Sequence, residues 1–254
     1  MSSRSWDAAT YERASDVQEA WAEGVLDRLP LRGDETVLDA GCGSGRVTRR
    51  LLERLPRGRV IAVDASEEMV EHARRALPER VTVLCSDLTD VELDEPVDAV
   101  FSNAVFHWVL DQDRLFWRMH AALRPGGLLV AGCGGEGNVE RFLATVDRIS
   151  TKPPFERHLA DLERAWRFPG DEETEARLRA AGFAQVRAWL EPSDVTPRDP
   201  AGFLRGAPLR CHLQRLPDDL QEPFVQEVLR QCGEPLRLDY RRLQIEARRP
   251  PETR

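Results

Sequence analysis

The chain lacks several features that would direct it to a membrane, out of the cytoplasm or onto a nucleic acid. It has no apolar run near the ~20 residues that span a bilayer, and its N-terminus has no apolar signal-peptide core. It also lacks an excess of positive charge, since it has 36 Lys and Arg residues against 44 Asp and Glu residues, which gives a net charge of −8. Duplex binding needs clustered cations. We therefore predict a cytoplasmic protein that engages neither a membrane nor a nucleic acid.

Paired cysteines and metal-ligand spacings are missing as well. The five cysteines are an odd number and include no CxxC pair, which indicates reduced thiols rather than a disulfide framework. No His, Cys or carboxylate group has the spacing of a metal site, so we predict no metal. No GxSxG sequence is present to place a nucleophilic serine on a sharp turn.

What the first half of the chain does contain is an alternation of short apolar runs and helical segments. Strands are predicted at 36–40, 59–63, 81–85, 97–102 and 128–133, and helices at 45–55, 66–77 and 111–123. Such alternation predicts βαβ units and a parallel sheet with helices on both faces, an α/β fold. The continuous apolar strands fit a sheet that is covered on both sides.

The second half is less regular. Its predicted elements are helical structure over 136–168, a helix at 171–181, a strand at 184–190, a proline-rich loop at 192–200, one or two helices over 201–231, and a last strand at 238–247. The helical stretches 136–168 and 201–231 interrupt the α/β pattern, and insertions of this kind often form lids over a site. We expect a single domain over 1–254, with a cover helix in 1–30 and a binding core over 31–135. The arginine pairs at 241–242 and 248–249 are expected on solvated faces.

A glycine-rich loop follows the first predicted strand. In DAGCGSG (39–45) the glycines let the backbone turn sharply and approach a ligand, and the helix that follows directs free N–H groups at it. Asp64 ends the second strand, 19 residues after Gly45, where a carboxylate can accept hydrogen bonds from both ribose hydroxyls. These features suit a nicotinamide dinucleotide or S-adenosylmethionine (SAM), and a plain structural turn is the simplest alternative.

Three details favour SAM. The dinucleotide pattern GxGxxG requires glycine or alanine at position 46, which is Arg46 here. Asp39 directly precedes the loop, where an acid would repel a pyrophosphate but attract the ammonium group of SAM. Asp87, at the end of the third strand, can accept a hydrogen bond from an adenine amino group.

Five segments in order resemble the core of class I SAM-dependent methyltransferases: VLDAGCGSG (37–45), IAVDAS (61–66), CSDL (85–88), FSNAVFHW (101–108) and LRPGGLLV (123–130). Within that class the chain is most similar to the trans-aconitate methyltransferase group, through its Ser-Asn-Ala…Trp segment and the closing LDYRRLQIEARR (238–249). The resemblance implies a Rossmann-like, doubly wound seven-stranded sheet of order 3-2-1-4-5-7-6, with the last strand antiparallel and helical lid insertions.

The resemblance also implies that SAM is the cofactor and which residues contact it. The methionine end would meet the glycine loop and the end of the fourth strand, whereas the ribose and the adenine would meet the ends of the second and third strands. The cofactor-binding residues so implied are Asp39, Gly41, Cys42, Gly43, Asp64, Ala65, Met69, Ser86, Asp87, Leu88, Asn103 and Ala104.

The acceptor side is less defined. His107 and Trp108 follow the fourth strand, and His107 is either a base, since an unperturbed imidazole titrates near pH ~6.5, or a packing residue. Tyr11 and Gln18 in the N-terminal cover, with Trp166 in the first insertion, complete the candidate acceptor site.

The predicted reaction is methyl transfer to an oxygen, carboxylate or hydroxyl, of a small molecule, with nitrogen and carbon acceptors left open. Ser-Asn-Ala-Val (102–105) stands where an Asn-Pro-Pro-Tyr sequence marks methylation of amide or adenine nitrogen. An NAD(P)-dependent oxidoreductase and a non-catalytic SAM-binding module are the alternatives. We expect a monomer or a homodimer.

Overall fold

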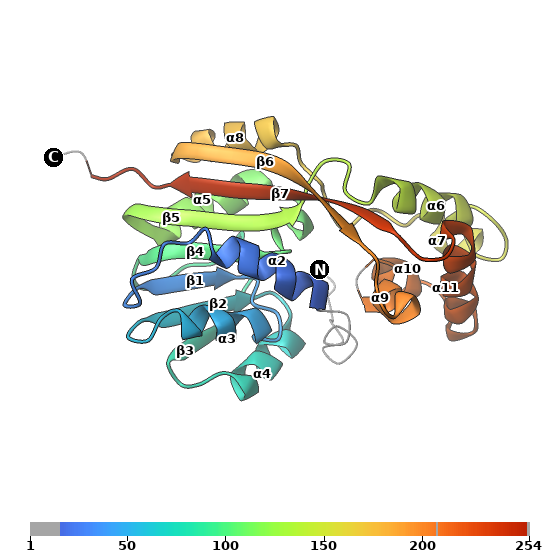
Figure 1. Cartoon of the computed structure of the whole chain (residues 1–254), viewed down its shortest axis with the longest axis horizontal. Helices are drawn as coiled ribbons and strands as arrows, with labels where there is room; N and C mark the ends of the chain where they lie inside the picture. Colours follow the sequence, from blue (N-terminus) through green and yellow to red (C-terminus); the bar gives the residue numbers. More distant parts are fainter. Residues whose placement is uncertain (1–15, 207, 253–254) are drawn as a thin grey trace.

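The computed structural model describes residues 16–206 and 208–252, and a seven-stranded sheet forms its centre (Figure 1). The strand order is β3-β2-β1-β4-β5-β7-β6, and β7 runs antiparallel to both of its neighbours. The predicted order and the antiparallel last strand are confirmed. The strands are β1 (Thr36–Ala40), β2 (Arg59–Asp64), β3 (Val81–Cys85), β4 (Val97–Asn103), β5 (Leu123–Gly134), β6 (Ala184–Val195) and β7 (Leu238–Arg248).

Parallel pairing brings the predicted site residues to one edge of the sheet. β1 pairs with β2 on one side and β4 on the other, so that the carboxyl ends of all three strands meet. Asp39 lies one residue before the end of β1, while Asp64 and Asn103 are the last residues of β2 and β4. In open α/β sheets this edge is where ligands bind.

Helices cover both faces of the sheet, as the alternation predicts. α2 (Asp16–Leu26), α3 (Arg46–Glu53) and α4 (Glu67–Ala76) bury apolar residues against one face, and α5 (Gln112–Ala122) and α8 (Asp171–Ala180) against the other. A 3-10 turn, η1 (Phe106–Trp108), follows β4. α4 begins at the predicted cap, where Ser66 Oγ accepts a hydrogen bond from Met69 N (3.4 Å).

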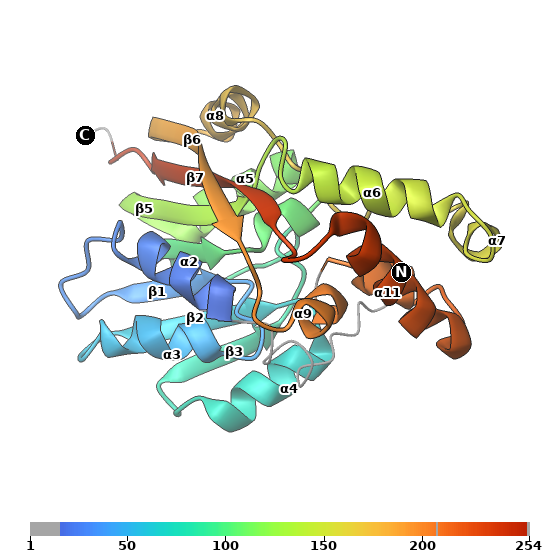
Figure 2. The same cartoon turned by 45° about the vertical axis from the view of Figure 1, so that its right-hand side comes forward.

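The two insertions form a second apolar cluster of their own. They contain the helices α6 (Glu140–Ser150), α7 (Glu156–Leu159), α9 (Pro200–Gly206), α10 (Arg210–Leu213) and α11 (Asp218–Cys232). Phe155 and Phe224 pack edge to face at 5.0 Å inside this cluster, which also takes in Leu238 at the start of β7. Figures 1 and 2 show these helices beyond the end of the sheet where β1 and β4 terminate.

Two predictions for the second half of the chain are wrong. The stretch 201–231 holds three helices rather than one or two, and residues 192–195, predicted as a loop, continue β6. Pro192 pairs with Arg241 at this point. β6 is the edge strand, and Arg241 donates its backbone N–H to Asn138 Oδ1 and accepts at its backbone oxygen from Gly135 N. The missing N–H of proline therefore leaves no ladder bond unmade. Among the helices of the described ranges, none is long and apolar enough to cross a membrane.

Candidate active site

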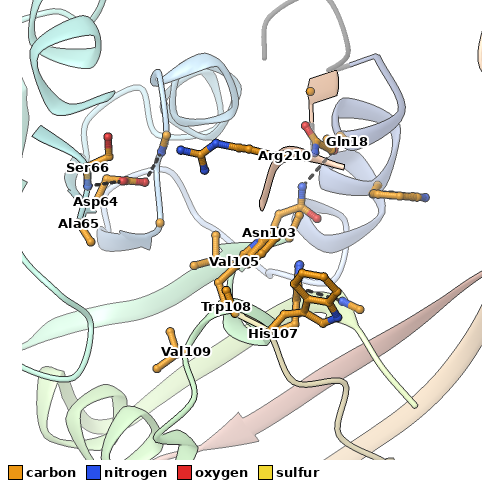
Figure 3. A pocket seen from close by; sticks show the side chains of 18 of the residues that line it. Gln18, Asp64, Ala65, Ser66, Asn103, Val105, His107, Trp108, Val109 and Arg210 are labelled. Atoms are coloured by element: carbon orange, nitrogen blue, oxygen red, sulfur yellow. Dashed lines mark hydrogen bonds between the residues drawn. The ribbon is translucent and has the colours of Figure 1, made fainter. Parts of the chain in front are cut away.

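A cavity of about 600 Å³ opens at the carboxyl edge of the sheet, between the strand ends and the insertion helices. Its size is within the range of sites that hold a small organic ligand. Figure 3 shows Asp64, Ala65 and Ser66 at one end, and Asn103, His107 and Trp108 apart from them toward the other. After the roles predicted from the sequence, we call these the cofactor end and the acceptor end.

The glycine loop forms one wall of the cofactor end. Gly41 has φ +91°, and a Cβ at this position would lie 2.3 Å from Val105 Cγ2, so only glycine fits. Gly43 has φ +54°, and a Cβ there would meet no atom within 4 Å. The loop therefore turns under Val105 and leaves its second glycine open to the cavity.

Asp64 closes the loop against the end of β2. Its Oδ2 accepts a hydrogen bond from Gly43 N (2.9 Å) and its Oδ1 accepts one from Ser66 N (2.9 Å). Burial raises the pKa of this carboxyl above its ordinary value. Each carboxylate oxygen has a lone pair left over, so the residue can still accept two ribose hydroxyls.

Asp39 is the most deeply buried acid at the site, with 2 % of its surface exposed. Thr48 Oγ1 donates a hydrogen bond to its Oδ2 (2.6 Å). Burial, aided by the nearby charge of Asp64, raises the pKa of Asp39 to about 7. A buried carboxyl without a cation is costly to ionise, and the ammonium predicted beside it would restore the charged form.

Not all of the predicted adenine-binding residues line the cavity. Ala65, Met69, Asp87 and Leu88 line the cavity, but Ser86 does not. Ser86 Oγ instead donates to the backbone oxygen of Asp87 (3.1 Å). Asp87 is exposed at the cavity mouth, and its Oδ1 accepts from Thr89 N (2.9 Å) and Thr89 Oγ1 (2.8 Å).

Asn103 connects three elements at the middle of the cavity. Its Nδ2 donates to Gln18 O of α2 (3.0 Å), and its Oδ1 accepts from Arg242 Nη2 of β7 (2.8 Å). Ala104, which follows, has φ +61°, an uncommon conformation for a residue with a side chain. This turn leads the chain from β4 into η1, which carries the acceptor-end residues.

His107 is held among aromatic rings at the acceptor end. Phe168 lies 5.7 Å and Trp108 5.0 Å from its ring centre, and Trp108 meets Trp166 edge to face at 5.8 Å. Gly134 N donates a hydrogen bond to His107 Nδ1 (3.3 Å). Burial, and secondarily the charge of Arg242, lower the pKa of His107 to about 3. The imidazole is therefore neutral, with its proton on Nε2.

Most of the predicted site residues meet at this cavity. Those that line it are Gln18, Asp39, Gly41, Cys42, Gly43, Asp64, Ala65, Met69, Asp87, Leu88, Asn103, Ala104, His107, Trp108 and Trp166. Tyr11 lies outside the described residues. Within the described ranges, no group of three or more His, Cys, Asp or Glu is arranged to hold a metal ion.

Sequence reasoning missed several residues of the acceptor end and of the insertion side. Trp21, Tyr240 and Arg242 line the cavity, and Arg210 extends into it from the insertion side (Figure 3). The interpretation of Arg242 as a solvated residue is wrong, since it is only 3 % exposed beneath α2. The available signal was alternation in the last strand, which places Arg242 and Arg241 on opposite faces.

Comparison with known proteins agrees with this geometry. The family model described as "Methyltransferase domain" matches residues 37–127. The chain is 42% identical over 248 residues to the trans-aconitate 2-methyltransferase of Azoarcus sp., covering 94% of each protein. It is 30% identical over 243 residues to that of Variovorax paradoxus, covering 94% of this chain and 93% of the relative.

The fold has solved counterparts too. A structure of Haemonchus contortus phosphoethanolamine N-methyltransferase 2, in complex with S-adenosyl-L-methionine, matches with a TM-score of 0.62 at 21% identity, over 96% of this chain and 56% of that one. Fold and relatives together define a SAM-dependent methyltransferase. The chain belongs to the class I methyltransferase family that includes the trans-aconitate 2-methyltransferases. Its cofactor is SAM, and the nicotinamide alternative is set aside.

Proposed function

We propose that this enzyme methylates a carboxylate oxygen of a small polycarboxylate, for which trans-aconitate is the model acceptor. The names of the two relatives supply the model compound. The observation that carries the proposal is the state of His107, the only histidine among the described residues that line the cavity. A hydroxyl acceptor needs a base, and a useful base titrates near the working pH.

His107 is poorly suited to that role. The Gly134 N–H occupies its Nδ1, and in the neutral ring Nε2 already carries the proton. With a pKa of about 3 the ring has little affinity for a second proton. The site therefore favours an acceptor that arrives ionised, and a carboxylate is ionised at neutral pH. His107 then serves as a hydrogen-bond donor through Nε2–H.

The residues of the cofactor end fit the cofactor. The open position at Gly43 leaves room for a ligand, and the buried Asp39 offers a carboxyl to its ammonium. When bound, SAM supplies an electrophilic methyl group on a sulfonium that leaves as a neutral thioether. The protein has to align the acceptor oxygen with that bond and exclude water, and such positioning is worth roughly 7–11 kcal/mol in favourable models.

The contacts of individual residues are part of the proposal. Asp64 takes the ribose, while Ala65, Met69, Asp87 and Leu88 surround the adenine, and Asn103 lies beside the methionine moiety. The helices of 136–168 and 201–231 act as lids. We further propose that the enzyme works in the cytoplasm, which suits the five free thiols, and that it is a monomer or homodimer.

Incubation with SAM and a panel of acceptors, followed by mass spectrometry, tests the reaction. The panel contains trans-aconitate, its trimethyl ester, a phenol and a primary amine. A gain of roughly 14 daltons on trans-aconitate alone is expected, because only that compound presents a carboxylate. Methylation of the phenol or the amine, with trans-aconitate unchanged, would refute the carboxylate assignment.

A further inference from the structure

Arg242 is a buried cation without an acidic partner. It is 3 % exposed, and none of the ion pairs formed among residues 16–206 and 208–252 includes it. Its Nη2 donates to the neutral Asn103 Oδ1 (2.8 Å), its guanidinium lies 4.4 Å above the ring centre of Trp21, and its Nε has no partner. Burying a charge without a counter-ion is unfavourable, and burial lowers the pKa of Arg242 to about 10.

The protein makes room for this cation at the cavity wall. Arg242 lines the cavity, and its guanidinium lies over Gly132 of β5, where a Cβ would come within 2.9 Å of Nη2. The aromatic ring of Trp21 and the amide of Asn103 hold the side chain without neutralising it. A planar guanidinium held in this way matches the two oxygens of a carboxylate.

A second donor lies at the same end. The Nε2–H of His107 is left free by the bond that Gly134 makes to Nδ1, and His107 also lines the cavity. Arg242 is near enough for its charge to act on the imidazole. A cation and a neutral N–H donor that face one cavity are suited to bind an anion.

The position of Arg242 distinguishes two carboxylate sources, the acceptor and the methionine end of the cofactor. β7 lies three strand spacings from β1, about 14 Å, with β4 and β5 between them. The glycine loop that receives the cofactor follows β1, whereas His107 and the aromatic residues around it are at the side toward β5 and β7. The guanidinium of Arg242 reaches back to Asn103 at the end of β4, but its strand lies on the side of His107, on which its charge acts, and we assign it to the acceptor end.

We propose that Arg242, with His107 Nε2–H beside it, binds a non-reacting carboxylate of the acceptor and so selects polycarboxylates over monocarboxylates. The proposal rests on the proposed function, because it presumes that the acceptor is a carboxylic acid. A second carboxylate held at this point leaves the first one to meet the methyl group. Arg242 is thus a specificity-determining residue of the acceptor site.

Kinetics of Arg242→Gln with trans-aconitate and with crotonate, a monocarboxylate, test the assignment. Loss of a charged hydrogen-bonding partner is expected to raise KM for trans-aconitate roughly 10- to 100-fold with little change in kcat. Activity on crotonate stays near the wild-type level, so the preference for the polycarboxylate collapses. Arg242→Lys restores part of it, because it keeps the charge and loses the planar fork. Arg241→Gln, on the exposed face of the same strand, is the matched control.

Binding measurements separate the two carboxylate sources and the two proposals. Calorimetry with S-adenosylhomocysteine and with methylthioadenosine, which has no carboxylate, is expected to give unchanged affinities in Arg242→Gln. A loss confined to S-adenosylhomocysteine would assign Arg242 to the cofactor and overturn the proposal. An unchanged KM and preference in a folded variant would overturn it as well.

Two further measurements cover the cases in which the wild type shows no reaction or the variant does not fold. If the wild type methylates no carboxylate, the proposed function fails. Binding of trans-aconitate to the S-adenosylhomocysteine complex then tests the anion site alone. Loss of this binding in Arg242→Gln supports the anion site, and unchanged binding overturns it.

If Arg242→Gln does not fold, His107→Asn replaces it, since its amide oxygen still accepts from Gly134 N while the Nε2 donor is lost. A roughly 3- to 10-fold rise in KM supports the proposal, and no change overturns it.

Discussion

Asp39 and Asp64 lie at the ends of adjacent strands, yet the protein holds them in different states. Asp64 accepts two backbone N–H groups and remains a hydrogen-bond acceptor for a neutral ligand. Asp39 has one hydroxyl partner, Thr48, and is buried further from solvent. One acid is thus prepared for hydroxyl groups, and the other for a positive charge.

Replacing Asp64 with alanine is expected to weaken binding of S-adenosylhomocysteine by roughly 1.5–3 kcal/mol, which is about 10- to 150-fold, because hydrogen bonds to a charged group are lost. The measurement is isothermal titration calorimetry. Asp64→Asn is the control that keeps one oxygen for the backbone of Gly43 or Ser66 and removes the charge. Wild-type affinity in a folded Asp64→Ala protein would show that another residue binds the ribose.

Asp39 is expected to make cofactor binding depend on pH. In the ligand-free protein the pKa of its carboxyl is about 7, raised by burial, and an ammonium group bound beside it would favour the ionised form. Affinity for S-adenosylhomocysteine is therefore expected to fall as pH drops below 7, by up to about tenfold per pH unit. Because the folded-state pKa is raised, the stability that the neutral carboxyl contributes to the ligand-free protein is lost as pH rises through 7.

Calorimetry between pH 5.5 and 8 measures this effect, together with proton release seen in buffers of different ionisation enthalpy. Asp39→Asn, which cannot ionise, is the control and should bind weakly at every pH. If the wild type and Asp39→Asn lose affinity in parallel as the pH falls, the titrating group is another residue.

At the scale of elements, the sheet core was predictable and the insertions were only partly so. β1 to β4 are short apolar runs whose ends are marked by glycine, serine, aspartate or asparagine, so their positions follow from local chemistry. β6 was predicted too short because Pro192 is a turn signal in isolation and becomes acceptable only at the edge of a sheet. Edge position is a tertiary property, which a single strand does not encode.

The insertion helices form their own apolar cluster, and we expect them to move more than the sheet. Their cluster rests on the ends of β6 and β7 rather than within the sheet core. Hydrogen exchange of α6, α9 and α11 in the ligand-free enzyme should be faster than that of β4. S-adenosylhomocysteine with trans-aconitate should slow it, since Phe142, Phe203 and Arg210 line the cavity. Equal protection in both states would contradict a lid role, and exchange in β4 provides the internal reference.

Across the whole molecule, the part of the site that one strand end and one loop form was predictable from the sequence. The part that forms where distant segments meet was not. The glycine loop and Asp64 are recognisable because a glycine-rich turn and an acid at that spacing indicate a nucleoside-binding site within a short stretch of sequence. Arg242 is 139 residues from its partner Asn103, and its burial depends on Trp21 of α2. Only the sheet order and the helix above it bring these three side chains together.

The cavity touches both the sheet and the insertion helices, so a bound cofactor should stabilise the molecule as a unit. At a ligand concentration of 100 Kd, binding to the folded state alone adds about 2.7 kcal/mol to the free energy of unfolding. For a chain of this size that corresponds to a rise in Tm of roughly 5–10 °C, measured by calorimetry with S-adenosylhomocysteine. NADH at the same concentration should leave Tm unchanged, because Arg46 occupies the position where the dinucleotide pattern requires glycine or alanine. Asp64→Ala, tested at the wild-type ligand concentration, should show a smaller rise. Stabilisation by NADH, without any stabilisation by S-adenosylhomocysteine, would contradict both the assignment of SAM as the cofactor and the binding role given to the glycine loop.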